Sequence, residues 1–402
     1  MATVLEHTGV RERETTFLSS IAAGRHLPPT PILFLSLFAA QAALVGLTPI
    51  LPQVAGELGV STAAAGQLRS VSGLAAGIAA LAMGRIARRV GLRDLLVGGL
   101  GGLGAGSLIG ATAPTFSVLA AAQVVVGASL AVVLSAGIAA AAAWAPEGSR
   151  SRVLSWTLAG QPTAWIVGIP ITGALAGVGW RWALLVVPFV SATLALVAVR
   201  SRQKDPPSGA GAGVGALWRR PGVAGWALGE FHAYSAWSAT LVFSGALFIE
   251  SYRATPRMTG LLLAMGAAAY VPGGLLARRW TGAGARRALV LLALLAGTGV
   301  AVFGAVRPGV WPSAAVFASL AFVGGARTLV GSAFGLDAAP EARVAVMSVR
   351  AAALQFGYLV GTAVGGAALA AGGYPALGFA LAAMFGLATA PHLAASARAR
   401  LG

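Results

Sequence analysis

The chain has 402 residues, of which 57% are hydrophobic and only 10% are charged, and its formal net charge is +17. A soluble protein devotes roughly a quarter of its residues to charged side chains, so this composition excludes an ordinary soluble domain and predicts that most of the surface faces lipid. The absence of cysteine also excludes disulfides and thiolate metal sites.

Residues 1–29 are polar and mixed in charge, without the apolar core and cleavage site of a secretory signal. We expect a cytoplasmic tail there. Twelve apolar segments follow, each close to the ~20 residues that a helix needs to cross hydrocarbon and none with the alternation of a membrane strand. They lie near residues 31–52, 62–83, 95–113, 117–141, 153–177, 181–199, 223–249, 258–277, 287–305, 311–335, 344–370 and 375–396.

The longest polar break, residues 200–221, contains the single lysine, Lys204, and a run of glycine, alanine and serine. This composition is typical of a flexible linker. It predicts an N-terminal six-helix bundle at residues 30–199 and a C-terminal six-helix bundle with a short tail at residues 222–402. The predicted fold is therefore an all-α membrane protein with twelve transmembrane helices in two six-helix bundles.

The two halves resemble each other, which indicates duplication. The sequence GRIARR at Gly84–Arg89 matches GLLARR at Gly274–Arg279 with an offset of 190, and Gln161 matches Gln355 with an offset of 194. Duplicated six-helix halves predict pseudo-symmetric bundles around an axis along the membrane normal.

The basic residues gather in every second loop and at both termini. This positive-inside pattern predicts that both termini face the cytoplasm of a bacterial inner membrane. The positive charge is thus a topology signal, and we expect no nucleic-acid partner. Seven arginines depart from the pattern: Arg181, Arg253, Arg257 and Arg307 in the opposite loops, and Arg69, Arg327 and Arg350 within helices.

Three motifs resemble one known family. The loop GRIARRVGLRDLL (Gly84–Leu96) is similar to the signature G-x-x-x-D-R-x-G-R-[RK] of major facilitator superfamily transporters. The helix GQPTAWIVGIPITGALAGVGWRW (Gly160–Trp182) resembles the glycine/proline antiporter motif of the drug and sugar efflux branch, and Leu47–Ser70 resembles the segment after the first helix of that branch. The resemblance covers essentially the whole chain and implies the major facilitator fold.

The chain departs from the family pattern at three places. Arg88 stands at the acidic position of the loop signature, with Asp94 six residues later. Gln123 stands where efflux antiporters usually carry an arginine, and the first helix has no acidic residue. Arg89, Gly91 and Arg93 still match the signature.

The motif residues have physical roles of their own. Gly84 and Gly91 suit a tight reversal, and Arg88, Arg89 and Arg93 either bind lipid phosphates and helix-end carbonyls or serve topology alone. In the fifth helix, Gly160, Gly168 and Gly173 permit close helix packing, and Pro170 can bend the helix. These gate and motif candidates are Gly84, Arg88, Arg89, Gly91, Arg93, Asp94, Gly168, Pro170 and Gly173.

Ionisable residues inside the membrane are costly and normally face a cavity or a partner. Glu230 and Arg327 lie about eight residues from the cytoplasmic ends of their helices, so a rise of 1.5 Å per residue places both ~12 Å deep. We predict an ion pair between them, the alternative being that Arg327 reaches the interface or backbone carbonyls. His232 either forms a hydrogen bond at a helix interface or relays protons. Arg69 and Arg350 lie near helix ends and are expected to reach the interface.

Several polar and aromatic residues are candidates for the wall of a solute cavity. Glu230, Tyr234 and Trp237 form one stripe at helical spacing. Gln161 and Gln355 are related by the repeat and could face each other, although hydrogen bonds between helices would explain them equally well. The full set is Gln41, Gln123, Gln161, Trp165, Tyr234, Trp237, Gln355 and Tyr358.

The resemblance implies a secondary transporter that exports a small amphipathic or drug-like solute in a proton-coupled, alternating-access cycle, as an efflux antiporter. The alternative is an uptake symporter or facilitator for a sugar or small metabolite. An anion carrier should place two or more arginines at mid-membrane, and from the sequence only Arg327 is near. We expect protons and membrane lipids as partners, a monomer, no cofactor and no metal. We also expect no enzymatic activity, since acid pairs, nucleophile sets and the phosphate loop G-x-x-x-x-G-K-[ST] are missing.

Overall fold

The computed structural model describes residues 28–87, 89–146, 149–202, 222–339 and 343–401. Within these residues the chain is helical and contains no strand, as expected. Residues 1–27 of the predicted tail and most of the predicted linker lie outside the described residues, as does Arg88.

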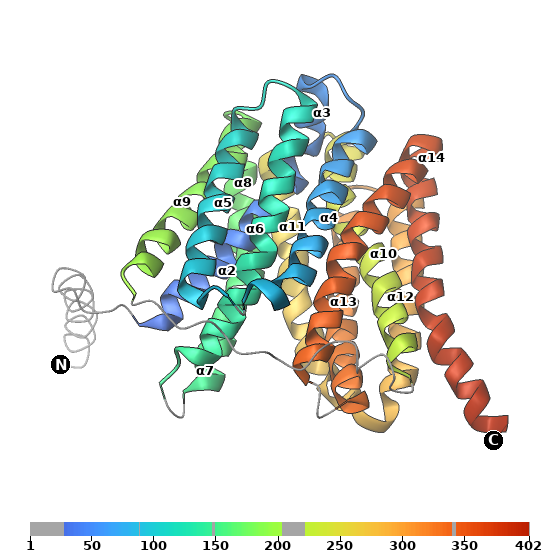
Figure 1. Cartoon of the computed structure of the whole chain (residues 1–402). Coiled ribbons are helices and arrows are strands. Elements are labelled where there is room, and N and C mark those ends of the chain that lie inside the picture. The colour runs from blue at the N-terminus through green and yellow to red at the C-terminus, as the bar shows by residue number, and fades with distance from the viewer. Residues whose placement is uncertain (1–27, 88, 147–148, 203–221, 340–342, 402) are drawn as a thin grey trace, which may run out of the picture.

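The first group of helices precedes residue 203 and runs back and forth along one direction (Figure 1). Its members are α2 (Pro29–Val45), η1 (Thr48–Ile50), α3 (Leu51–Glu57), α4 (Thr62–Ile86), α5 (Leu92–Ala111), α6 (Phe116–Ala143), α7 (Arg150–Thr163), η2 (Ala164–Gly168), α8 (Ile169–Leu175) and α9 (Trp180–Arg200). We call these the first helix group.

The second helix group follows residue 221. Its members are α10 (Val223–Tyr252), α11 (Pro256–Leu276), η4 (Ala277–Trp280), η5 (Gly282–Gly284), α12 (Ala285–Ala305), α13 (Val310–Ala338) and α14 (Arg343–Leu401). The long α14 is two helices joined at a kink, where Gly373 has φ 65°. Only glycine adopts this left-handed backbone easily, and the kink falls between the segments predicted at 344–370 and 375–396.

Each of the twelve predicted segments falls on helical structure when α2, η1 and α3 are taken as one segment, α7, η2 and α8 as another, and α14 as two. Within the described residues, eight spans are long and apolar enough to cross a membrane by themselves. They are Pro29–Glu57, Leu92–Ala111, Phe116–Ala141, Trp180–Arg200, Pro256–Leu276, Gly282–Ala305, Val310–Ala338 and Val349–Ala394. The helices α4 and α10 and the segment formed by α7, η2 and α8 are not among these spans. The number of twelve membrane crossings stays a prediction.

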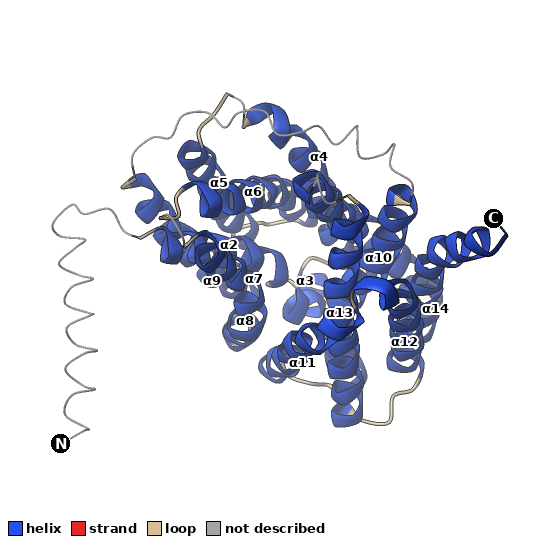
Figure 2. Cartoon of the chain, turned by 90° about the horizontal axis from the view of Figure 1, so that it is seen from below, coloured by secondary structure: helices blue, strands red, loops and turns tan. Residues whose placement is uncertain are grey.

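The helices of both groups run between the same two ends of the molecule. The first residues of α2 and α10 and the last residues of α9 and α14 lie toward one end, the bottom of Figure 1, which we call the linker end. The opposite end, at α3, we call the far end. Helices of each group pack mainly on one another, and the groups meet through α4 with α14, α8 with α11, and α10 with η1. Figure 2 shows α8 beside α11 in the view from the linker end.

Candidate functional site

Glu230 is the most deeply buried charged residue in the part of the chain that the structure describes. It lies on α10, is fully shielded from solvent, and its Oε1 is 3.0 Å from Nη1 of Arg327 on α13. The predicted ion pair is therefore confirmed. A second nitrogen of Arg327, Nη2, donates a hydrogen bond of 3.1 Å to the carbonyl of Gly229, which fixes the guanidinium against α10.

A second arginine reaches the same carboxylate. Nε of Arg350, on α14, lies 3.5 Å from Oε2 of Glu230, and its Nη2 donates a hydrogen bond to the hydroxyl of Tyr234. The expectation that Arg350 extends to the interface is wrong. Its guanidinium turns instead toward the buried carboxylate of Glu230, which attracts it. We call Glu230, Arg327, Arg350 and Tyr234 the charged cluster.

Glycine at position 331 allows α10 and α13 to meet at the cluster. A Cβ on Gly331 would lie 2.5 Å from Oε1 of Glu230, closer than carbon and oxygen approach without a shift. The carbonyl of the same glycine accepts a hydrogen bond of 2.8 Å from Nε1 of Trp226 on α10. The sequence gives no signal for this contact, because the residue carries no side chain.

Aromatic rings lie beside the charged cluster. Trp237 stacks on Tyr270 of α11, with ring centroids 6.3 Å apart and planes 25° from parallel. Tyr270 also forms a side-chain hydrogen bond with Thr328 of α13, one residue beyond Arg327. The predicted stripe of Glu230, Tyr234 and Trp237 thus contacts α11, α13 and α14, and packs within the second helix group.

The described residues include two of the four histidines, His232 and His392. The ring of His232 packs edge-on against Phe231, and its Nδ1 has no hydrogen-bond partner among the described residues. The helix-interface hydrogen bond expected for His232 is therefore not seen at that nitrogen. The more buried histidine is His392 on α14, which is 4% exposed and packs against Phe334.

Polar contacts join the two helix groups toward the far end. Thr62 of α4 donates to Oε1 of Glu250 at 2.5 Å, and Tyr374 donates to Oε2 of the same carboxylate at 2.7 Å. Nearer the middle, Gln67 donates to the carbonyl of Thr362 on α14 at 2.9 Å. Among the described residues, every hydrogen bond between the groups lies on the far-end side of the charged cluster.

The buried Arg69 belongs to the same contact region between the two groups. We call this region the far-end seam; it includes the contacts of Thr62 with Glu250, of Gln67 with Thr362 and of Arg69 with Tyr358. The guanidinium of Arg69 lies over the ring of Tyr358 on α14, 4.3 Å from the centroid, and donates to Ser72 at 2.7 Å. Arg69 is only 2% exposed, so its expected extension to the interface is also wrong. Among the described residues no carboxylate pairs with Arg69, and the face of the Tyr358 ring stabilises its positive charge instead.

Glycines let the backbones touch along the far-end seam. A Cβ on Gly245 would lie 2.1 Å from the carbonyl oxygen of Thr48, and one on Gly173 would lie 2.5 Å from that of Pro256. Gly173 therefore permits close packing as expected, but with α11 of the other group. Gly168 has only ordinary contacts. The π-helical turn Ala164–Gly168 directly precedes α8, of which Pro170 is the second residue.

The remaining cavity candidates are dispersed. Gln41 and Gln123 are buried in the first helix group, and Trp165 packs against its core. Gln355 is buried on α14, and no hydrogen bond joins it to the half-buried Gln161 among the described residues. The carboxamide oxygens of Gln123 and Gln355 have no hydrogen-bond partner there.

The loop of the sequence signature holds helix ends together. Arg93 pairs with Asp94 at 2.9 Å and donates to the last carbonyl of α9, that of Arg200, at 2.7 Å. This is the carbonyl contact expected of the loop arginines. Gly91 is the residue before the first turn of α5, Gly84 lies within α4, and Arg89 is exposed.

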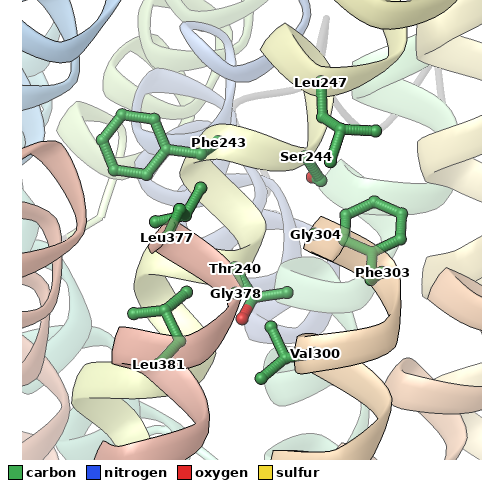
Figure 3. A pocket seen from close by; sticks show the side chains of 10 residues that line it. All are labelled: Thr240, Phe243, Ser244, Leu247, Val300, Phe303, Gly304, Leu377, Gly378 and Leu381. Carbon is green, nitrogen blue, oxygen red and sulfur yellow. The ribbon is translucent and has the colours of Figure 1, made fainter. Parts of the chain in front are cut away.

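A small pocket lies elsewhere, between α10, α12 and α14 (Figure 3). Its lining is mostly apolar, and its hydroxyl groups, Thr240 and Ser244, donate to carbonyls of their own helix. None of the predicted cavity residues lines it. The described residues contain no group of three His, Asp or Glu side chains that could hold a metal ion.

Comparison with known proteins identifies the family. The sequence profile described as "Major Facilitator Superfamily" matches residues 33–243, which is more than half of the chain. The chain belongs to the major facilitator superfamily. It is thus an integral membrane protein of a transporter family, and the predicted resemblance is confirmed.

Structures of other superfamily members support the fold. A bacterial homologue of the human lysosomal transporter Spinster, in an inward-facing and unoccupied conformation, superposes with a TM-score of 0.73 over 92% of this chain and 96% of the other, at 14% identity. The nucleoside transporter NupG gives a TM-score of 0.71 over 92% and 99%, at 13% identity. At such identities the likeness extends to the fold alone.

Curated relatives align over shorter stretches. A chloramphenicol resistance protein of Streptomyces lividans is 32% identical over 145 residues, which is 35% of this chain and 37% of that protein. The transcription regulatory protein OpdE of Pseudomonas aeruginosa is 30% identical over 182 residues, which is 43% of this chain and 45% of that protein. The matches thus span less than half the length of either relative.

Proposed function

We propose that this superfamily member exports a small amphipathic solute by alternating access, with proton coupling at Glu230. The observation that carries the proposal is the fully buried carboxylate between two arginines on apolar helices. Ionisable groups at such depth are costly and normally serve the transport path. A buried carboxylate that changes partners between two conformations can take up a proton in one and release it in the other.

Alternating access requires two bundles that separate at one end while they close at the other. We take the first and second helix groups as these bundles. The positive-inside pattern of the basic loops supports a cytoplasmic linker end, and the far-end seam would then be the closed outer gate. Polar contacts and close glycine packing between the two groups are what a gate that opens and closes again would use.

Efflux is favoured over uptake by the likeness to the chloramphenicol resistance protein. The aromatic rings of Tyr234, Trp237 and Tyr270 next to a charged group would suit a solute with an apolar body and a polar end. Chloramphenicol, named in that relative, is the natural first probe.

The test is efflux of chloramphenicol from proteoliposomes containing the purified protein, with and without an imposed pH gradient. We expect gradient-dependent flux in the wild type and loss of the dependence in Glu230→Gln. The matched control is Glu57→Gln, because Glu57 pairs with Arg181 at 2.7 Å on the exposed far end. Flux that ignores the gradient, or that keeps its gradient dependence in Glu230→Gln, would rule out proton coupling at this residue.

One observation favours the second candidate, uptake of a sugar or small metabolite. The carboxamide oxygens of Gln123 and Gln355 are buried without a partner among the described residues, and buried acceptors normally find donors. Solute hydroxyl groups would provide them. Inward flux of a labelled sugar with the pH gradient, lost in Gln355→Leu, would decide for uptake.

A further inference from the structure

The charged cluster has more positive than negative charge. It contains one carboxylate, that of Glu230, and two guanidiniums, those of Arg327 and Arg350. With both arginines ionised, as they always are in proteins, the sum is +2 −1 = +1. The neighbouring Tyr234 contributes a hydroxyl and no charge. The carboxylate therefore compensates for one arginine only.

The two arginines are held unequally. The side chain of Arg327 is 6% exposed and lies 3.0 Å from Oε1, with a further hydrogen bond to α10. The side chain of Arg350 is 20% exposed and lies 3.5 Å from Oε2, and its Nη2 donates to the hydroxyl of Tyr234 and, at 3.4 Å, to the carbonyl of Thr328. Arg350 thus has the longer ion pair with Glu230 and is the more accessible of the two.

Hydrogen-bonding capacity also remains unused. Nε of Arg327 and Nε of Arg350 are buried and find no acceptor with hydrogen-bond geometry among the described residues. Glu230 approaches both guanidiniums without receiving a well-aligned hydrogen bond on either oxygen. A guanidinium binds a carboxylate or phosphate best through two parallel hydrogen bonds, and the present pairing leaves that arrangement open.

A surplus charge bears directly on transport. In alternating access the site must at some point be closed to water on both sides, and an uncompensated buried ion is then at its most costly. An anion beside Arg350 brings the local sum to zero while Glu230 stays ionised and paired with Arg327. A neutral solute leaves the surplus in place.

We infer that the transported solute carries an anionic group, a carboxylate or phosphate, that binds Arg350 in competition with Glu230. The inference rests on the proposed function and specifies its substrate class as an amphipathic acid, in place of the neutral chloramphenicol that serves there as the first probe. It also corrects an expectation from the sequence, in which only Arg327 lay near mid-membrane and an anion was disfavoured. The aromatic rings of Tyr234 and Trp237 would receive the apolar body.

The test compares three probes of similar shape: phenylacetate, phenylacetamide and phenethylamine. Binding is measured as thermal stabilisation of the protein purified in a maltoside detergent, at constant ionic strength and followed by tryptophan fluorescence. We expect stabilisation by phenylacetate only. Arg350→Gln should weaken it about tenfold or more, since a hydrogen bond to a charged group contributes about 1.5–3 kcal/mol. Arg181→Gln, which breaks an arginine–carboxylate pair away from the cluster, should not change it.

The sign of the Glu230 effect separates competition from direct contact. If the solute anion and Glu230 compete for Arg350, phenylacetate should bind more tightly to Glu230→Gln than to the wild type. Phenylacetate should stabilise Glu230→Ala most of all, because that variant also leaves space for a carboxylate. The double variant Glu230→Ala/Arg350→Gln should lose this gain. Equal stabilisation by all three probes, weaker phenylacetate binding in Glu230→Gln, or no phenylacetate effect in either wild type or Glu230→Ala overturns the inference.

Two further arms separate the alternatives. Adding phosphatidylglycerol tests a lipid headgroup as the anion: stabilisation by this lipid through Arg350, without any by phenylacetate, would overturn the solute inference. The binding assay does not depend on transport. Phenylacetate binding without flux in vesicles would therefore refute the proposed function alone, and chloramphenicol flux without phenylacetate binding would refute the inference alone.

Discussion

Replacing Gly331 by alanine tests the steric basis of the charged cluster. The new Cβ would lie 2.5 Å from Oε1, 2.9 Å from Cδ and 3.0 Å from Oε2 of Glu230, so three atoms of one carboxylate would be too close. Either α13 moves away from α10 or the carboxylate turns away from Arg327. Overpacking a tight site costs about 1–3 kcal/mol, and complete loss of a buried ion pair about 3–5 kcal/mol. We expect a loss of about 1–3 kcal/mol in unfolding free energy.

Equilibrium unfolding in dodecyl sulfate, followed by tryptophan fluorescence, measures this loss. Gly101→Ala is the matched control, because a Cβ there meets nothing within 4 Å and alanine is the better helix former. A double-mutant cycle with Glu230→Ala isolates the contact, since removing the carboxylate removes the clash. If Gly331→Ala costs as much with alanine at position 230 as with glutamate, the steric reasoning is refuted.

Three further predictions concern the far-end seam, the packing of α7 on α2, and the contact of Arg93 with the end of α9. Glu250→Ala should speed the labelling of an introduced Ser70→Cys by a membrane-impermeant maleimide, because it removes an acceptor that joins the groups, and the natural chain has no cysteine to react; unchanged labelling would argue against a gate. Gly160→Leu should lower the thermal unfolding temperature, because even a Cβ would lie 2.3 Å from the carbonyl oxygen of Phe34; an unchanged value would contradict that packing. Arg93→Ala should cost only about 0.2–1 kcal/mol in unfolding free energy, since its ion-pair partner Asp94 is exposed to solvent; a loss several times larger would show the loop contact to be central to the fold.

The depth argument from the sequence correctly predicted the ion pair of Glu230 with Arg327. It missed Arg350, which also lies beside Glu230. Glu230 lies 230 − 223 = 7 residues into α10, and Arg350 lies 350 − 343 = 7 residues into α14. At 1.5 Å per residue both are ~10 Å from the linker end. The same counting would have placed Arg350 beside Glu230, but proximity to a helix end suggested extension to the interface.

Other features of the site had no signal in the sequence. The contact of Arg69 with Tyr358 depends on which faces of α4 and α14 meet, and helical periodicity cannot specify this when both helices are apolar on most sides. The same holds for Trp237 and Tyr270. The helical character of the apolar segments, in contrast, followed from apolar length alone, because hydrocarbon thickness restricts a membrane span far more than a soluble core restricts a helix.

The charged cluster and the far-end seam lie on the same two helices. α10 carries Glu230 at one level and Glu250 at the other, and α14 carries Arg350 followed by Tyr358 and Thr362. From Arg350 to Thr362 is 362 − 350 = 12 residues, or ~18 Å of helix at 1.5 Å per residue. A helix moves largely as a rigid body over this length, so a shift of α14 when Arg350 changes partner must displace the seam contacts of Tyr358 and Thr362. Arg350→Gln should therefore alter the labelling rate of Ser70→Cys although the two residues do not touch. Unchanged labelling would mean that the site and the gate respond independently, and an occupied site could then not determine which end of the molecule is closed.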